Sequence, residues 1–517
     1  LKVSDTVIRN TSNDGAVQNA AFVSGATCPA AVNGNKTLTD QQASPNTFLI
    51  NATEIMYDPI RNPLGNNNGL CQSGEGCIYS PNFGSYQGEG VLRAPCIFQN
   101  GVVTGVSMYA WSINGVGAPG TLDVTFGAAG ESFIAQGANN SGYAIIAQQA
   151  DGKILGIGDG WNGTENIFNI MRTNPDGSLD SGFNGAGKFA YSLGVGLNVA
   201  PFAVVLQRDG KFIVGGRTWT TSYDMILVRF NTDGTTDTSF GSNGVVITDS
   251  GFDWDRIRAL AVQPDGKILA SAGWGTGGGN TSGAIIRFHP DGTLDSGFGT
   301  GGRTLIPGTY EANAVVVQSD GNIVLTGFAS TNEIFVARVL ESNGSLDTSF
   351  NGSGILLIPP TINAWAEAFA VSLQSDGKIL VGGVDHTWGV TGQLYVARLN
   401  TNGTLDVSFN TTGKLNINLA GMTYESVHAI RSLPDGRILL AGDDYSYGFG
   451  GKDPGFVLRL LQTGNLDPSF GVSGQTTVWN EGSLNTRLTS IVVSPDGRIL
   501  VGGSKVGSDL SILRLWP

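Results

Sequence analysis

The chain has 517 residues, of which 77 are glycine and only 14% are charged, and its formal net charge is −13. This composition favours many short strands joined by turns over helices, which use more Ala, Glu, Lys and Leu. An acidic chain with scattered Lys and Arg binds phosphate backbones poorly, and no apolar stretch reaches the roughly 20 residues of a membrane-spanning helix. We therefore expect an all-β protein with no nucleic-acid partner and no membrane span in this chain.

Residues 1–118 carry none of the repeated motifs found further along the chain. They are rich in turn-forming residues, with strand-like runs at Thr47–Asn51, Gly90–Phe98 and Val102–Ser112. This pattern predicts a small, mostly-β N-terminal domain.

The four cysteines of the chain all lie in this segment. They form no C-x-x-C pair and have no histidine among them, so the pattern favours two disulfides in an exported protein over a zinc site. Two disulfides among four cysteines allow three connectivities. We favour a local Cys71–Cys77 loop, with Cys28–Cys96 holding the domain together. We expect no metal and no cofactor anywhere in the chain.

Residues 119–517 are dominated by a repeat of 55–61 residues that carries three motifs. An Asp-Gly turn precedes a run of the Lys/Arg-Ile-Leu type, an arginine ends a later apolar run, and the pattern Leu/Thr-Asp-x-x-Phe follows. Each motif occurs seven times. The aspartates of the Asp-Gly turns are Asp151, Asp209, Asp265, Asp320, Asp376, Asp435 and Asp496.

Each repeat is interpreted as four strands, a to d. In the second repeat these are Phe202–Gln207, Lys211–Gly215, Met225–Phe230 and Val245–Thr248. Asp-Gly between two β-rich runs indicates a hairpin, because glycine accepts a positive φ. Four short strands in a unit of this length are typical of a propeller blade. Seven repeats therefore predict a seven-bladed β-propeller.

The spacing of the motifs predicts how the ring closes. The arginine precedes the aspartate of Leu/Thr-Asp-x-x-Phe by eight residues in five repeats and by nine in one. Asp123 has no such arginine upstream, and Arg514 has no such aspartate downstream. Writing Pro517 directly before Pro119 places the two residues eight apart. Blade 7 is therefore expected to take strands a to c from the C-terminus and strand d from about Glu131–Ala135, which leaves no open end.

The recurring arginine and aspartate are expected to be structural. Catalysis occurs at one place in a protein, whereas this pair recurs in every repeat, so we predict ion pairs that fix the c–d turn. The predicted pairs are Arg172–Asp180, Arg229–Asp237, Arg287–Asp295, Arg398–Asp406, Arg459–Asp467 and Arg514–Asp123, with Arg338–Asp347 as the nine-residue variant.

The repeat resembles the delta-60 repeat family of bacterial β-propellers. The resemblance rests on Asp-Gly-Lys-Ile-Leu followed by Gly-x-Leu-Asp-x-Ser-Phe-Gly, and it covers about 400 residues of the chain. It implies an extracellular or surface protein, and it implies no activity shared by the family.

The two faces of the predicted propeller differ. The a–b and c–d turns form a regular face of tight Asp-Gly turns, whereas the b–c and d–a loops form a variable-loop face with aromatic and acidic residues. Such residues suit carbohydrate recognition, because a ring stacks on a sugar face and carboxylates bind hydroxyls. The alternative is that the rings pack the loops against one another. The candidate ligand-binding residues are Trp161, Trp219, Tyr223, Trp254, Trp274, Trp365, Asp385, His386, Trp388, Tyr445 and Tyr447.

We predict a non-enzymatic binding and display protein of the surface-adhesin or appendage-tip type, located outside the cell or on its surface, with a glycan or surface partner. The chain enters and leaves the propeller at one c–d turn, so residues 1–118 are expected behind the regular face as an anchor or assembly domain. One alternative is a structural subunit of a surface filament or virion fibre. The other is a polysaccharide hydrolase or lyase, with Asp253, Asp255, Asp385 and His386 as candidates.

Overall fold

The computed structural model divides the chain into two compact units, Leu1–Ala118 and Pro119–Leu515 with Pro517. No described residue belongs to a helix, so the described part contains no helix that could span a membrane. The expected position of the first unit relative to the second stays a prediction. The structure describes residues 7–10, 48–49, 90–91, 96–99, 102–106, 118–134, 144–251, 254–275, 281–362, 364–387, 391–419, 422–444, 454–478, 487–505 and 509–517.

Within Leu1–Ala118, every described residue except Ala118 lies in a strand. These strands form a three-stranded sheet of order β2-β1-β3 and a β4-β5 hairpin. The run predicted as one strand over Gly90–Phe98 is two strands, because its two ends pair with different partners. Cys28, Cys71, Cys77 and the side chain of Cys96 lie outside the described part of the structure, so the disulfides stay a prediction. The strands are β1 (Val7–Asn10), β2 (Phe48–Leu49), β3 (Gly90–Val91), β4 (Cys96–Gln99) and β5 (Val102–Val106).

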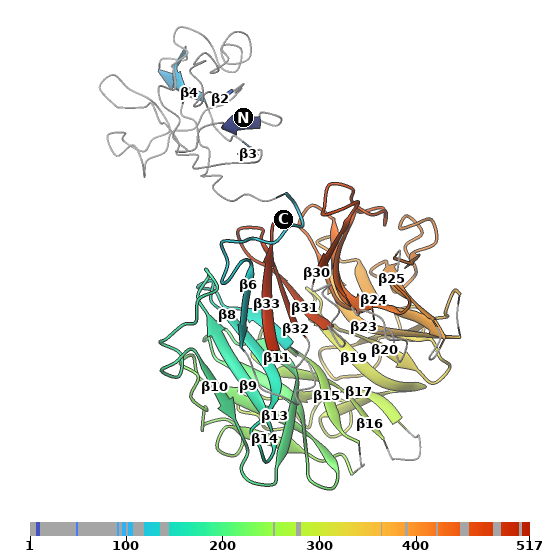
Figure 1. Ribbon diagram of the computed structural model, residues 1–517. Coiled ribbons are helices and arrows are strands. Elements are labelled where there is room, and N and C mark those ends of the chain that lie inside the picture. Colours follow the sequence, from blue (N-terminus) through green and yellow to red (C-terminus); the bar gives the residue numbers. More distant parts are fainter. Residues whose placement is uncertain are drawn as a thin grey trace. The chain divides into compact units, whose positions relative to one another are not determined.

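The second unit is a seven-bladed propeller of four-stranded antiparallel sheets (Figure 1). In blades 1 to 7, strand a, the innermost, is β7 (Ala144–Gln148), β11 (Asn198–Leu206), β15 (Arg256–Val262), β19 (Thr309–Val317), β23 (Trp365–Leu373), β27 (Glu425–Ser432) and β31 (Arg487–Val493). Strand b is β8 (Ile154–Trp161), β12 (Phe212–Trp219), β16 (Ile268–Gly275), β20 (Ile323–Ala329), β24 (Ile379–Thr387), β28 (Ile438–Asp444) and β32 (Ile499–Lys505). Strand c is β9 (Asn166–Thr173), β13 (Tyr223–Phe230), β17 (Thr281–Phe288), β21 (Ile334–Val339), β25 (Thr391–Leu399), β29 (Gly455–Leu460) and β33 (Asp509–Leu515). Strand d is β10 (Lys188–Tyr191), β14 (Val245–Thr248), β18 (Arg303–Ile306), β22 (Ile355–Ile358), β26 (Lys414–Ile417), β30 (Gln475–Val478) and β6 (Glu131–Ile134).

Blade 7 joins the two ends of the propeller sequence. β6 pairs antiparallel with β33, with Ile134 opposite Leu510 and Glu131 opposite Leu513, and the two strands lie side by side in Figure 1. The sheet order is β31-β32-β33-β6, which confirms the predicted closure. Every strand d has four residues, so the outer edge of each blade is short, which limits edge-to-edge pairing with other chains.

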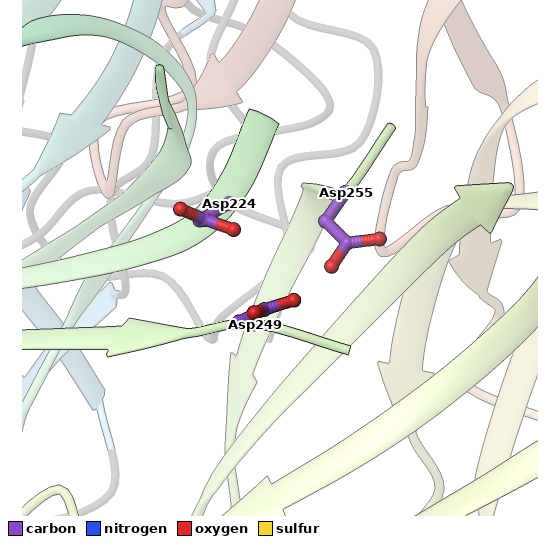
Figure 2. Close-up of side chains that lie close together, drawn as sticks. All are labelled: Asp224, Asp249 and Asp255. Atoms are coloured by element: carbon purple, nitrogen blue, oxygen red, sulfur yellow. The ribbon is translucent and has the colours of Figure 1, made fainter. Parts of the chain in front are cut away.

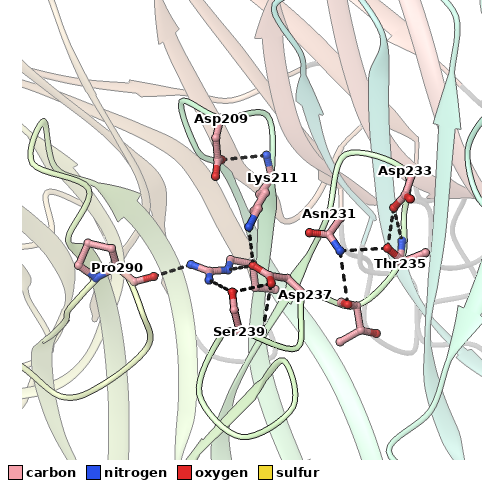
Figure 3. Close-up of polar contacts among 10 residues, drawn as sticks. Asp209, Lys211, Asn231, Asp233, Thr235, Asp237, Ser239 and Pro290 are labelled. Carbon is pink, nitrogen blue, oxygen red and sulfur yellow. Dashed lines mark hydrogen bonds and ion pairs between the residues drawn. The ribbon is translucent and has the colours of Figure 1, made fainter.

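An ion pair holds the c–d turn of each blade, and Figure 3 shows the surroundings of this pair in blade 2. Asp237 Oδ2 lies 2.7 Å from Arg229 Nε and 2.8 Å from Lys211 Nζ, and Asp237 Oδ1 accepts a hydrogen bond from the Ser239 hydroxyl at 2.7 Å. Arg229 also donates to the carbonyl oxygen of Pro290 in blade 3. Burial raises the pKa of Asp237, but these hydrogen bonds and the guanidinium charge outweigh it and hold the pKa well below its usual range. The arginine therefore fixes its own turn and joins it to the next blade.

The same arrangement spans the ends of the propeller sequence. Arg514 Nε lies 2.7 Å and Arg498 Nε 2.9 Å from Asp123 Oδ2, and Asp123 is fully buried. Arg514 Nη1 donates to the carbonyl oxygen of Pro175 in blade 1 at 2.5 Å. One ion pair thus connects blade 7 internally and joins it to blade 1.

The phenylalanine of Leu/Thr-Asp-x-x-Phe is fully buried in every blade, and in six blades its ring lies against the glycine of the c–d turn of the next blade. Gly403 of such a turn has a φ of +86°, and a Cβ atom there would lie 2.8 Å from the ring of Phe350. Only glycine meets both conditions at low cost, and burial of each ring contributes about 1.5–3 kcal/mol. The seven rings are Phe126, Phe183, Phe240, Phe298, Phe350, Phe409 and Phe470.

Asp123→Asn is expected to lower the free energy of unfolding by about 3–5 kcal/mol, because it leaves a buried guanidinium beside a neutral amide. Urea denaturation followed by circular dichroism measures the loss. Asp151→Asn, in an exposed a–b turn, is the matched control and should cost less than about 1 kcal/mol. Equal, small losses for both variants would contradict the role of Asp123 in closing the ring.

Candidate functional site

Buried carboxylates hold the d–a loops of the variable-loop face. Asp385, fully buried, accepts hydrogen bonds from the backbone N–H of Thr361 at 2.7 Å and of Ile362 at 3.1 Å. Burial raises the pKa of Asp385, but these bonds, the Thr361 hydroxyl and the Asn416 amide outweigh it and hold the pKa below its usual value. Asp444 accepts from the N–H groups of the next d–a loop in the same way. The buried carboxylates of strand b therefore hold the d–a loops in place through their backbone N–H groups.

The neighbouring His386 is 3% exposed and lies between two aromatic rings. Its centroid is 5.9 Å from that of Trp365 and 5.5 Å from that of Tyr424. Burial lowers the pKa of His386, although the charge of Asp385 opposes the change. In this part of the variable-loop face the aromatic rings pack the loops against each other. This agrees with the alternative interpretation of these residues, in which the rings stabilise the loops and do not bind a ligand.

Three of the candidate rings form one stack at the junction of blades 2 and 3. The ring centroids of Tyr223 and Trp254 are 4.8 Å apart with an interplanar angle of 29°, and those of Trp219 and Tyr223 are 5.6 Å apart. The guanidinium of Arg217 lies 4.4 Å from the Tyr223 centroid and 5.2 Å from the Trp219 centroid, within cation–π range. Trp254 remains 48% exposed. We call Trp219, Tyr223 and Trp254 the aromatic stack.

The backbone fixes the exposed member of the aromatic stack. The Trp254 N–H donates to the carbonyl of Gly275, and the Asp255 N–H donates to that of Tyr223, each at 3.1 Å. The Asp255 carboxylate, fully buried, accepts bonds from the N–H and the hydroxyl of Ser250, both at 2.7 Å. The loop that carries Trp254 is thus tied to strands b and c of neighbouring blades.

Three carboxylates from the strands and loop that carry Tyr223 and Trp254 gather in one place (Figure 2). Asp224 follows Tyr223 in β13, Asp249 follows β14, and Asp255 follows Trp254; one oxygen of each lies within 4.8 Å of the others. Burial raises the pKa of Asp224 and of Asp255, and the nearby charge of Asp249 adds to both rises. Among the described residues this group has the geometry to hold a cation, and its carboxylates can also accept hydrogen bonds from hydroxyls.

The other candidate residues are placed separately. Trp161 ends β8 and is 38% exposed. Trp274 lies in β16, with its side chain outside the described part of the structure. Trp388, Tyr445, Tyr447 and Asp253 also fall outside it.

The charged residues of the central channel escaped the sequence reasoning. Strand a lines the channel of a propeller, and a β-bulge recurs in this strand in blades 2 to 7. A bulge adds one residue and re-aims the side chains around it. The added residues are Phe202, Arg258, Asn313, Phe369, His428 and Thr489.

Two glutamates on neighbouring blades of the channel have opposite pKa shifts. Glu311 accepts bidentate hydrogen bonds from both Arg256 and Arg258, at 2.6–2.9 Å. Burial alone would raise the pKa of Glu311, but the two guanidinium groups lower it to about 2. Glu367 accepts a bond from Asn313 Nδ2 at 3.1 Å, while burial and the charge of Glu311 raise its pKa. Such opposed pairs occur in acid–base sites and in structural ion-pair networks alike.

A second polar group in the channel consists of Ser426, His428 and Asp443. His428 Nε2 lies 2.9 Å from Ser426 Oγ and 3.0 Å from Asp443 Oδ1. A nucleophilic triad needs the serine and the carboxylate on different ring nitrogens. Here both contact the same nitrogen, so this arrangement is not such a triad.

The architecture defines the chain as a seven-bladed β-propeller protein. Six segments match the family described as a "Domain of unknown function (DUF5122) beta-propeller", so the chain carries repeats of this family. The matched residues are 149–183, 207–240, 263–298, 318–350, 374–409 and 433–470. Each segment runs from an a–b turn to the phenylalanine of Leu/Thr-Asp-x-x-Phe, and the seventh such unit is the one divided between the two ends of the propeller sequence.

Solved structures show likeness in fold alone. The PQQ-bound aldose sugar dehydrogenase of Streptomyces coelicolor is 14% identical with a TM-score of 0.38, over 64% of this chain and 97% of that one. The α-L-arabinofuranosidase arb93a of Fusarium graminearum is 11% identical with a TM-score of 0.38, over 61% and 92%. Sqt1 of Chaetomium thermophilum, bound to the N-terminus of ribosomal protein L10, is 15% identical with a TM-score of 0.39, over 74% and 98%. No curated protein matches the chain in sequence.

The prediction of a non-enzymatic protein is wrong as it was drawn. It rested on the repeated, architectural nature of the charged pairs, yet two of these similar propellers are enzymes by name. A repeated scaffold therefore does not exclude catalysis, because one blade can depart from the repeat. The likeness in fold does not establish catalysis in this chain either.

Glu425 makes the stability of the propeller depend on pH. This residue is 1% exposed and accepts the N–H of Leu419; burial raises its pKa to about 7, with a further rise from Asp444. The folded state therefore holds this proton more tightly than the unfolded state. Its stabilising contribution is complete below about pH 4.5 and is lost by about pH 7, a change on the order of 3 kcal/mol.

Glu425→Gln is expected to remove this dependence, because the amide oxygen still accepts the N–H of Leu419 and carries no charge. The variant should be more stable than the wild type at pH 8 by about 1–3 kcal/mol, and equally stable near pH 4. Thermal denaturation from pH 4 to pH 8 measures the difference. A constant difference between the two proteins over that range would contradict the burial of an ionisable group at this position.

Proposed function

We propose that this protein binds carbohydrate through the aromatic stack and the adjoining carboxylates, as an extracellular or cell-surface binding and display protein. The observation that carries the proposal is Trp254, which stacks on Tyr223 and is still 48% exposed. With one ring face against Tyr223, the other is available to a ligand. An apolar ring face beside hydrogen-bond acceptors matches a sugar, which has an apolar face and a rim of hydroxyls.

The rigidity of the stack supports this proposal. Arg217 and Tyr223 support the rings from one side, and two backbone hydrogen bonds hold the loop of Trp254. Ordering a side chain on binding costs about 0.5–1.5 kcal/mol, and a ring that is already fixed avoids most of that cost. Asp224 and Asp249 supply hydrogen-bond acceptors for sugar hydroxyls, and approaching hydroxyl donors reduce the repulsion between these two charges.

The display role extends to the rest of the chain. We infer that residues 1–118 serve as an anchor or assembly segment, and that the repeats, with their period of 55–61 residues, are of the delta-60 type. The symmetric regular face then acts as scaffold, and the variable-loop face meets the partner.

A polysaccharide hydrolase or lyase is the second candidate. Glu311 and Glu367 favour it, since they line one channel on neighbouring blades with their pKa values shifted in opposite directions. In such an enzyme Glu367 would hold the proton for a leaving oxygen. Glu311, bound by two arginines, would carry the negative charge.

Trp254→Ala in the full chain is expected to weaken carbohydrate binding at least about tenfold, because it removes the stacking surface. A glycan array identifies the bound sugars, and calorimetry with the best of them measures the loss. Trp161→Ala is the matched control, since Trp161 is exposed on the same face and stacks on no described ring. It should retain binding within about twofold of the wild type.

Three results would redirect the proposal. A blank array for the wild type contradicts carbohydrate binding. Burial of Trp254 against a second copy in an assembled filament favours a structural subunit. Release of reducing or unsaturated sugars by the wild type, abolished by Glu367→Gln and kept by Trp254→Ala, favours the enzyme.

A further inference from the structure

The innermost strands of the propeller carry slightly more arginine than glutamate, although the chain as a whole is acidic. The described residues of strand a in the seven blades include four arginines, three glutamates, and neither lysine nor aspartate. Four arginines against three glutamates give these strands a formal net charge of +1, whereas the whole chain carries −13.

Arg431 differs from the other charged residues described in the channel. Arg256 and Arg258 share the carboxylate of Glu311, but no carboxylate among the described residues lies within ion-pair distance of Arg431. Its Nε donates to the carbonyl of Ile491 in blade 7 at 3.1 Å, which uses one of its five donors. The terminal nitrogens have no hydrogen-bond acceptor in the described structure.

The surroundings of Arg431 are accessible and yet poorly hydrated. The side chain is exposed to solvent along the channel, while the surrounding walls displace water and lower its pKa. The equivalent position, three residues after the bulge, is uncharged in each of the other five blades in which this bulge is described. These residues are Val205, Ala261, Val316, Ser372 and Val492.

The arginine at position 431 is an exception to the repeat, and this indicates that it is not part of the repeated framework. A residue that holds a blade together recurs in the other blades, as Arg229 and its equivalents do. A guanidinium at one of six equivalent positions has no such role, and enclosing a charge without a counter-charge costs stability. A bound anion would offset that cost.

We infer that Arg431 is a receptor in the central channel for the carboxylate group of a small organic anion. The planar guanidinium presents parallel N–H groups that match the two oxygens of a carboxylate, and its single charge balances one carboxylate. The site is separate from the aromatic stack and does not rest on the proposed carbohydrate binding.

Calorimetric titration of the full chain with D-glucuronate at low ionic strength tests this inference. D-Glucose serves as the neutral analogue and inorganic phosphate as an anion of different shape. The wild type should bind glucuronate more tightly than either, and Arg431→Gln should weaken that binding about 10- to 100-fold through loss of charge-assisted hydrogen bonds. Arg431→Lys, which keeps the charge and loses the fork, should fall between them.

The controls separate the channel from the rest of the molecule. Arg208→Gln makes the same change of charge in an exposed a–b turn and should bind glucuronate like the wild type. The Arg431 variants are also compared in a Trp254→Ala background, so that binding of the sugar ring at the aromatic stack does not contribute to the measured difference. Arg431→Gln should melt at or above the wild-type temperature, because a charge without a counter-charge is removed; a melting temperature well below it would assign Arg431 a structural role instead.

Three outcomes would overturn the assignment. The first is a wild type that binds no glucuronate. The second is an Arg431→Gln variant that binds it unchanged. The third is equal affinity for inorganic phosphate, which would show a general anion site and not one for a carboxylate.

Discussion

The buried arginine–aspartate pair of the c–d turn is the interaction on which the rest of the propeller depends. In blade 2 the guanidinium of Arg229 binds Asp237 in its own turn and the carbonyl of Pro290 in the next blade. A blade buries its two sheet faces only against its neighbours. A contact that sets the angle between neighbours, repeated around the ring, therefore decides whether the ring closes, and Arg514 with Asp123 completes it.

This regularity has a consequence for function. The Asp-Gly turns and ion pairs stabilise the blades on the regular face. The b–c and d–a loops on the other face are not needed for this, so their length and sequence can differ in each blade. They are nevertheless held, since buried carboxylates such as Asp255 and Asp385 accept their backbone N–H groups. Acidic residues near the variable-loop face thus serve mainly to shape it, and the exposed ring of Trp254 is presented on a fixed loop.

Departure from the repeat identifies the places where function is to be sought. On the variable-loop face, the residues that depart from the repeat are the aromatic stack and the three carboxylates. In the channel, they are the charged residues of strand a. The channel brings together residues from blades far apart in sequence, such as Arg256, Glu311 and Arg431, of which the first two form an ion pair. A repeated scaffold supplies the stability, and single blades contribute the residues that break the pattern.

The number of blades, their strands and the closure of the ring follow from the sequence, because a contact between residues eight apart in a turn is local and recurs at a fixed period. The exposed and stacked state of Trp254 and the burial of Asp385 and His386 do not follow from it. In a strand, neighbouring side chains point to opposite faces, so a shift of one residue decides which of them is buried. The bulge in strand a makes such a shift, and only the packing of seven blades around one channel sets Arg431 apart from its equivalents.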